Sequence, residues 1–138
     1  MIVKILAIVL ALLLIGAMAG CAVKDNKDGE NTEGYKHISQ DEAKKMIELD
    51  DGHVIVDVRR ESEYKSGHIP GAILVPNESI KDEKPEALPD TNQIILVYCR
   101  SGVRSKMASK KLAELGYTNV YEFGGLLTWD GELVKESE

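Results

Sequence analysis

The sequence predicts a single α/β domain with a central parallel sheet and helices on both faces. Apolar runs typical of buried strands, at residues 54–58, 94–98 and 120–123, alternate with segments of helical pattern. Parallel strands need crossover connections, which helices usually supply. Roughly 100 residues follow the polar N-terminal stretch, which is the size of one domain.

The first helix is predicted over residues 39–49, with Ser39 as its N-cap and Glu42 reaching back to it as in a capping box. Asp51-Gly52 then turns the chain into the strand at 54–58.

A short helix is predicted over residues 60–66, and Gly67 ends it. A short strand follows at 72–75, and Pro76 breaks it. Residues 77–91 are charged and contain two prolines, so we expect a loop with one helical turn near Ile80.

The second half of the chain repeats the alternation. The strand at 94–98 precedes a helix over 103–115, and Gly116 stops that helix. A last strong strand is predicted at 120–123, and a short helix at 126–129.

A cysteine in a tight loop between strand and helix is the principal candidate nucleophile. Cys99 directly follows the strand at 94–98, and the next helix begins at Val103. Backbone N–H groups of such a loop, together with the positive end of the helix, favour a thiolate over a thiol. Asp57, Cys99 and Phe123 each lie at the carboxyl end of a predicted strand. These residues should therefore lie close together at one edge of the sheet.

Several motifs stand in a defined order along the chain. They are Asp57-Val58-Arg59, Glu63-Tyr64, Gly67-His68-Ile69-Pro70-Gly71-Ala72, Cys99-Arg100-Ser101-Gly102-Val103-Arg104-Ser105, and Gly124-Gly125 with Trp129. This set resembles the rhodanese-like family. The resemblance implies a rhodanese-like domain at residues 37–138 and sulfurtransferase chemistry without a cofactor. In that chemistry, Cys99 accepts a sulfane sulfur from thiosulfate or a persulfide, and passes it to a thiophilic acceptor such as cyanide or a thiol.

Substrate binding is assigned to the six residues after Cys99, which are Arg100, Ser101, Gly102, Val103, Arg104 and Ser105. Most of them are expected to contribute backbone N–H groups. Arg100 is expected to point outward and to set donor preference. Arg104 either binds the anion or ties the loop to a carboxylate.

Three residues outside the loop are expected to support the site. Asp57 and Arg59 are predicted to hold the scaffold. His68 is predicted to be a hydrogen-bonded turn residue, with a role as a base as the alternative. Trp129 is expected to pack in the core, with a place in the pocket wall as the alternative.

The sequence also bears on functions other than sulfur transfer. Cysteine phosphatases have one residue more between Cys and Arg than the four that separate Cys99 from Arg104, so this narrower loop disfavours a phosphate. A sulfur- or anion-binding module that serves a partner without turnover is the main alternative, and a redox-sensing thiol is another. The net charge of −6 argues against nucleic acid, and the three histidines show no metal-ligand spacing.

The N-terminus is predicted to be a signal peptide at residues 1–20. Its apolar run at 5–19 has 15 residues, short of the roughly 20 that span a membrane. Met18-Ala19-Gly20-Cys21 resembles a bacterial lipoprotein signal, which implies lipidation of Cys21 and an extracytoplasmic, membrane-anchored protein. An uncleaved signal anchor and a cysteine without this role are the alternatives. Residues 21–36 are predicted to be the lipidated cysteine and a polar tether.

The chain has two cysteines. With Cys21 lipidated, Cys99 is the only free thiol, so neither an internal disulfide nor a dithiol mechanism is expected.

Overall fold

The computed structural model describes residues 31–137. The strands are β1 (Asn31–Thr32), β2 (Tyr35–His37), β3 (Val54–Asp57), β4 (Ile73–Leu74), β5 (Ile95–Cys99) and β6 (Val120–Gly125). The helices are α2 (Gln40–Ile47), α3 (Glu61–Ser66) and α4 (Val103–Glu114), with 3-10 turns η1 (Asn77–Ser79) and η2 (Leu126–Thr128). The predicted signal peptide and Cys21 lie outside the described residues.

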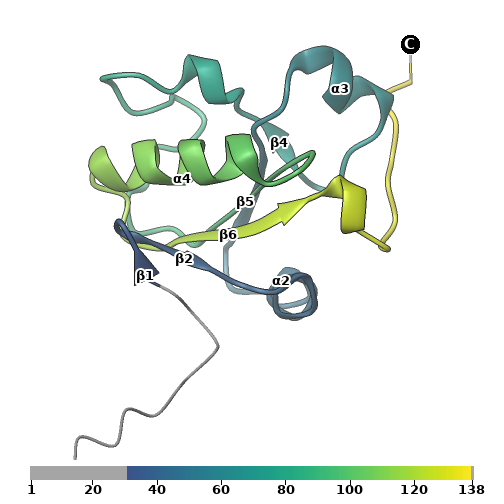
Figure 1. The fold of residues 1–138 in the computed structure, drawn as a ribbon, viewed down its shortest axis with the longest axis horizontal. Coiled ribbons are helices and arrows are strands. Elements are labelled where there is room, and N and C mark those ends of the chain that lie inside the picture. Colours follow the sequence, from purple (N-terminus) through teal and green to yellow (C-terminus); the bar gives the residue numbers. More distant parts are fainter. Residues whose placement is uncertain (1–30, 138) are drawn as a thin grey trace, which may run out of the picture.

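A six-stranded sheet in the order β1-β2-β6-β5-β3-β4 forms the centre of the domain (Figure 1). β1 pairs with β2 in antiparallel fashion, and the other neighbouring strands are parallel. All five residues of β5 are buried, as expected for a parallel strand covered on both sides. The predicted parallel α/β architecture is confirmed.

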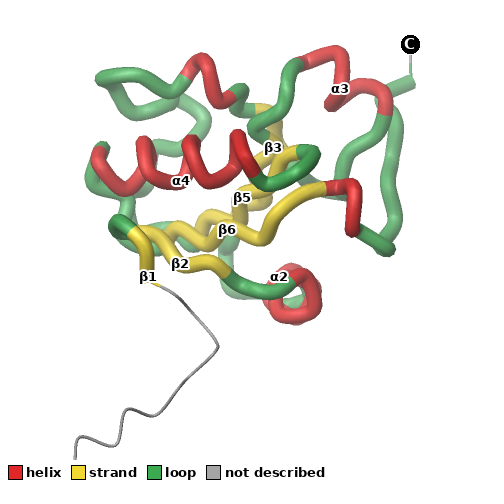
Figure 2. The backbone as a smooth tube through the Cα atoms, viewed as in Figure 1, coloured by secondary structure: helices red, strands yellow, loops and turns green. Residues whose placement is uncertain are grey.

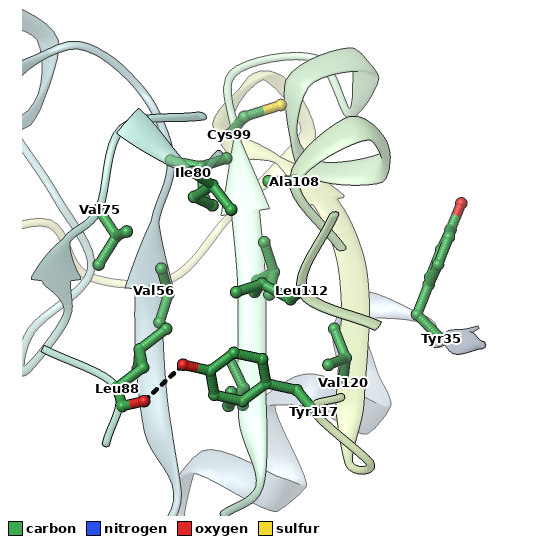
Figure 3. Close-up of a cluster of buried hydrophobic side chains, with 13 residues drawn as sticks. Tyr35, Val56, Val75, Ile80, Leu88, Cys99, Ala108, Leu112, Tyr117 and Val120 are labelled. Carbon is green, nitrogen blue, oxygen red and sulfur yellow. Dashed lines mark hydrogen bonds between the residues drawn. The ribbon is translucent and has the colours of Figure 1, made fainter. Parts of the chain in front are cut away.

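Helices cover both faces of the sheet, with α4 on one side and α2 on the other (Figure 2). Because strand residues alternate between faces, Val97 and Cys99 pack with Ala108 and Leu112 of α4 (Figure 3). Their neighbours in β5, Leu96 and Tyr98, belong to the second apolar cluster, on the α2 side. The two clusters together bury the sheet.

Local signals set where the helices begin. The Ser39 hydroxyl accepts a hydrogen bond from the Glu42 N–H at 3.1 Å, so Ser39 caps α2 as predicted. The longest helix within residues 31–137, α4, begins at Val103 directly after Gly102, whose φ of +100° falls in the left-handed region that favours glycine.

Most predicted element ends lie within one or two residues of the observed ones, and two differences follow from pairing within the sheet. β6 continues to Gly125 rather than ending at Phe123, because its backbone pairs with Cys99 past a register shift in β5. The predicted tether, which ended at Lys36, is too long, because β1 and β2 belong to the sheet. Tyr35 in β2 is only 8% exposed and is part of the apolar cluster that packs against α4.

In residues 31–137, no helix combines the length and the apolar character needed to cross a membrane.

Leu112→Ala is expected to lower the free energy of unfolding by about 2–5 kcal/mol, because the Leu112 side chain is fully buried between α4 and the sheet. Urea unfolding at neutral pH measures this loss. Leu49→Ala is the matched control, since Leu49 is 56% exposed, and its effect should stay within about 0.5 kcal/mol. Equal losses in the two variants would contradict the packing of α4.

Candidate active site

Cys99 lies at the carboxyl end of β5, beside the first turn of α4 (Figure 3). The Gly102 N–H donates to Cys99 Sγ at 3.0 Å, and the thiol lies 3.4 Å from the Ser105 hydroxyl. The residue has no exposed surface. The sulfur is therefore held under its own loop by one backbone donor and one hydroxyl.

The loop rests directly on the end of β6. A Cβ atom on Gly125 would lie 2.1 Å from the Arg100 carbonyl oxygen, so no other residue allows this approach. The same carbonyl accepts a hydrogen bond from the Leu127 N–H at 3.0 Å. The Gly124-Gly125 pair is thus part of the site, because it sets the height of the loop above the sheet.

The outer side of the loop faces solvent. Arg100, Ser101 and Val103 are exposed, whereas Gly102 and Ser105 are buried. Within residues 31–137, Arg100 takes part in no ion pair. Its guanidinium is available to an approaching anion.

Arg104 is bound to a carboxylate. Its two terminal nitrogens donate to the two oxygens of Glu63 at 2.7 and 2.9 Å, which joins α4 to α3. The hydrogen bonds from Arg104 lower the pKa of Glu63 to about 2, and the same contact raises the pKa of Arg104. Of the two roles expected for Arg104, the contacts match the tie to a carboxylate.

Asp57 and Arg59 form a buried ion pair at the end of β3. The Arg59 Nη2 atom lies 2.7 Å from Asp57 Oδ2 and also donates to the Gly67 carbonyl at 2.6 Å. Burial alone would lower the pKa of Arg59, but its hydrogen bond and Coulombic attraction to Asp57 raise it. The pair fastens the turn after α3 to the sheet.

His68 and Trp129 contact the scaffold. The His68 ring stacks on Tyr64 with centroids 3.8 Å apart, and its Nδ1 lies 2.9 Å from the Tyr64 carbonyl. The Trp129 ring packs against Phe123 at 5.7 Å. These contacts describe a turn residue and a partly buried ring packed against the α2-side core.

The structure also brings Glu122 and His37 to the site, and the sequence analysis assigned neither of them to it. Glu122 is fully buried in β6, and its Oε1 accepts from the Ser105 hydroxyl at 2.6 Å and from the Gly124 N–H at 2.7 Å. Its Oε2 lies 2.6 Å from His37 Nδ1. The available signal was a glutamate inside an otherwise apolar strand, since a buried carboxylate needs partners.

A sequence model of the Rhodanese-like domain matches residues 39–132. The chain belongs to the rhodanese-like family. The rhodanese-like domain is 41% identical over 71 residues to thiosulfate sulfurtransferase PspE of Escherichia coli (strain K12), covering 51% of this chain and 68% of that protein.

Solved structures agree with the family assignment. A rhodanese-like domain protein from Staphylococcus aureus superposes with a TM-score of 0.64 at 33% identity, covering 73% of this chain and 98% of that one. A structure described as rhodanese with anions from E. coli gives a TM-score of 0.56 at 37% identity, covering 61% and 99%.

Across residues 31–137, no three or more His, Cys, Asp or Glu side chains are grouped so that they could hold a metal ion.

Glu63→Gln tests the ion pair between Glu63 of α3 and Arg104 of α4. The depressed pKa of Glu63 means that its contribution is complete above the unfolded value of 4.5 and is lost as the pH falls toward 2. The variant should lose about 1–2 kcal/mol of unfolding free energy at pH 7, after allowance for partial exposure. The difference from wild type should shrink as the pH approaches 2.

Urea unfolding at several pH values between 7 and 2 measures this difference. Glu61→Gln removes an exposed carboxylate paired with Lys65 on the same helix and should have the smaller effect. A Glu63→Gln difference that does not change with pH would argue against the assigned ion pair.

Proposed function

We propose that this rhodanese-like domain is a thiosulfate or persulfide sulfurtransferase with Cys99 as its nucleophile. The observation that carries the proposal is the position of Cys99 Sγ, 3.0 Å from a loop N–H at the start of α4. A backbone donor and a helix N-terminus both stabilise negative charge on sulfur. The family relationship to a thiosulfate sulfurtransferase supports the same activity.

The proposed reaction has two displacement steps. The Cys99 thiolate attacks the outer sulfur of thiosulfate, the S–S bond of the donor breaks, and sulfite leaves with the electron pair. The resulting persulfide is then attacked at its terminal sulfur by cyanide or a thiolate. The Cys99–sulfur bond breaks, the thiolate is restored, and thiocyanate or a new persulfide is released.

An anionic donor suits the outer side of the loop. Arg100 is exposed, and so are its loop neighbours Ser101 and Val103. The anion-bound rhodanese from E. coli is a relative of the same fold. Arg100 is proposed to steer the donor, while Arg104 stays with Glu63.

Thiosulfate is expected to add one sulfur atom to the protein. Intact mass of the full chain, purified in detergent, should rise by about 32 Da after incubation with thiosulfate, and cyanide should remove the gain with release of thiocyanate. Cys99→Ser should show neither change, because it lacks the nucleophile.

Absence of an adduct from both thiosulfate and a small persulfide would remove the sulfurtransferase proposal. Such a result would support the binding module that serves a partner protein. Oxidation of Cys99 by peroxide at a rate far above its reaction with either donor would support a redox sensor instead.

We also propose that Cys21 is lipidated and anchors the domain outside the cytoplasm of a bacterium. The proposal rests on the apolar segment that ends in Met18-Ala19-Gly20-Cys21. Two or more acyl chains on one residue give stable membrane attachment, whereas a single chain holds only marginally.

Cys21→Ser is expected to abolish attachment of acyl chains. Expression of the chain in a bacterial host with a radiolabelled fatty acid should label the wild type and not the variant. Cys99→Ser is the matched control and should be labelled like wild type. Unlabelled wild type in the membrane fraction would favour an uncleaved signal anchor.

A further inference from the structure

The Cys99 residue has no exposed surface, so the groups that face its thiol are protein groups. Among the described residues, the side chain within hydrogen-bond distance of Sγ is Ser105, at 3.4 Å. The Gly102 N–H is the other neighbour and can only donate. A proton that leaves the thiol therefore has one nearby acceptor, the Ser105 oxygen.

The Ser105 hydroxyl has a single proton and several neighbours. Its oxygen lies 2.6 Å from Glu122 Oε1, 3.0 Å from the Gly102 carbonyl and 3.3 Å from the Gly124 carbonyl. The Ser105 hydroxyl donates its proton to Glu122 Oε1, because this acceptor is charged and lies at the shortest distance. The hydrogen bonds then run in one direction, from thiol to hydroxyl to carboxylate.

We propose that Ser105 and Glu122 form the path that removes the proton from Cys99 and returns it. The proposal rests on the proposed role of Cys99 as nucleophile. The S–H bond breaks as its proton passes to Ser105 Oγ, while the hydroxyl proton passes to Glu122 Oε1. The products are a thiolate and a neutral carboxylic acid, with no change in oxidation state. When Cys99 leaves its persulfide in the second step, the same transfer in reverse gives the thiol.

The surroundings of Glu122 support this exchange. His37 from β2 is the titratable group in contact with it, and its side chain is 51% exposed, so the far end of the path reaches water. Cys99 contributes to the raised pKa of Arg104 from α4, and Glu63 from α3 binds that guanidinium. Gln40 from α2 is neutral and donates to the Gly125 carbonyl.

The experiment measures alkylation of Cys99 by iodoacetamide between pH 5 and 9 in the full chain, with the modified site identified by mass spectrometry. Alkylation needs the thiolate alone, so the result does not depend on any sulfur donor. Glu122→Gln keeps the side-chain shape and should slow alkylation near pH 6–7 by about 100-fold. Ser105→Ala should slow it equally, and the double variant should be no slower than either single variant, because both residues act in one path.

Matched variants make the outcome decisive. Glu114→Gln removes an exposed carboxylate from the same helix as Ser105 and should leave the pH profile unchanged. Ser105→Thr retains a hydroxyl and should recover most of the rate. Faster alkylation in Glu122→Gln would show that the carboxylate opposes the thiolate, and rates equal to wild type would show no proton path. Either result would overturn the proposal.

Discussion

Glu122 is a carboxylate without exposed surface in the middle of the sheet, and several parts of the structure are arranged around it. Burying such a group is costly unless hydrogen-bond partners satisfy its oxygens. The partners come from three different elements, with Ser105 from α4, the Gly124 N–H from β6 and His37 from β2. The hydrogen bonds to the Glu122 carboxylate therefore hold the start of α4 close to the end of β6.

The position of the Cys99 loop follows from this arrangement. Ser105, held by Glu122, fixes the first turn of α4, and the loop crosses β6 where Gly125 has no Cβ to obstruct the Arg100 carbonyl. The two arginines of the loop have different roles because their surroundings differ. Arg104 is bound to α3 through Glu63, whereas Arg100 stays exposed at the surface that a donor would meet.

Most of the elements could be predicted from the sequence, because apolar periodicity and turn residues act over a few neighbouring positions. The boundaries were less predictable. β6 runs on to Gly125 because pairing with Cys99 continues there, and Tyr35 belongs to the core because β2 joins β6 at the side of the sheet. Both corrections depend on contacts between segments far apart in the chain.

The sequence by itself determined the fold class, the reactive cysteine and its loop, because local apolar patterns and contiguous motifs specify each of them. The tertiary structure decided which carboxylate meets which side chain. Arg104 is separated by 41 positions from Glu63, and His37 by 85 from Glu122. No local pattern specifies such pairs. They form because the parallel sheet places β2 beside β6, and β3, which leads to α3, beside β5, which leads to α4.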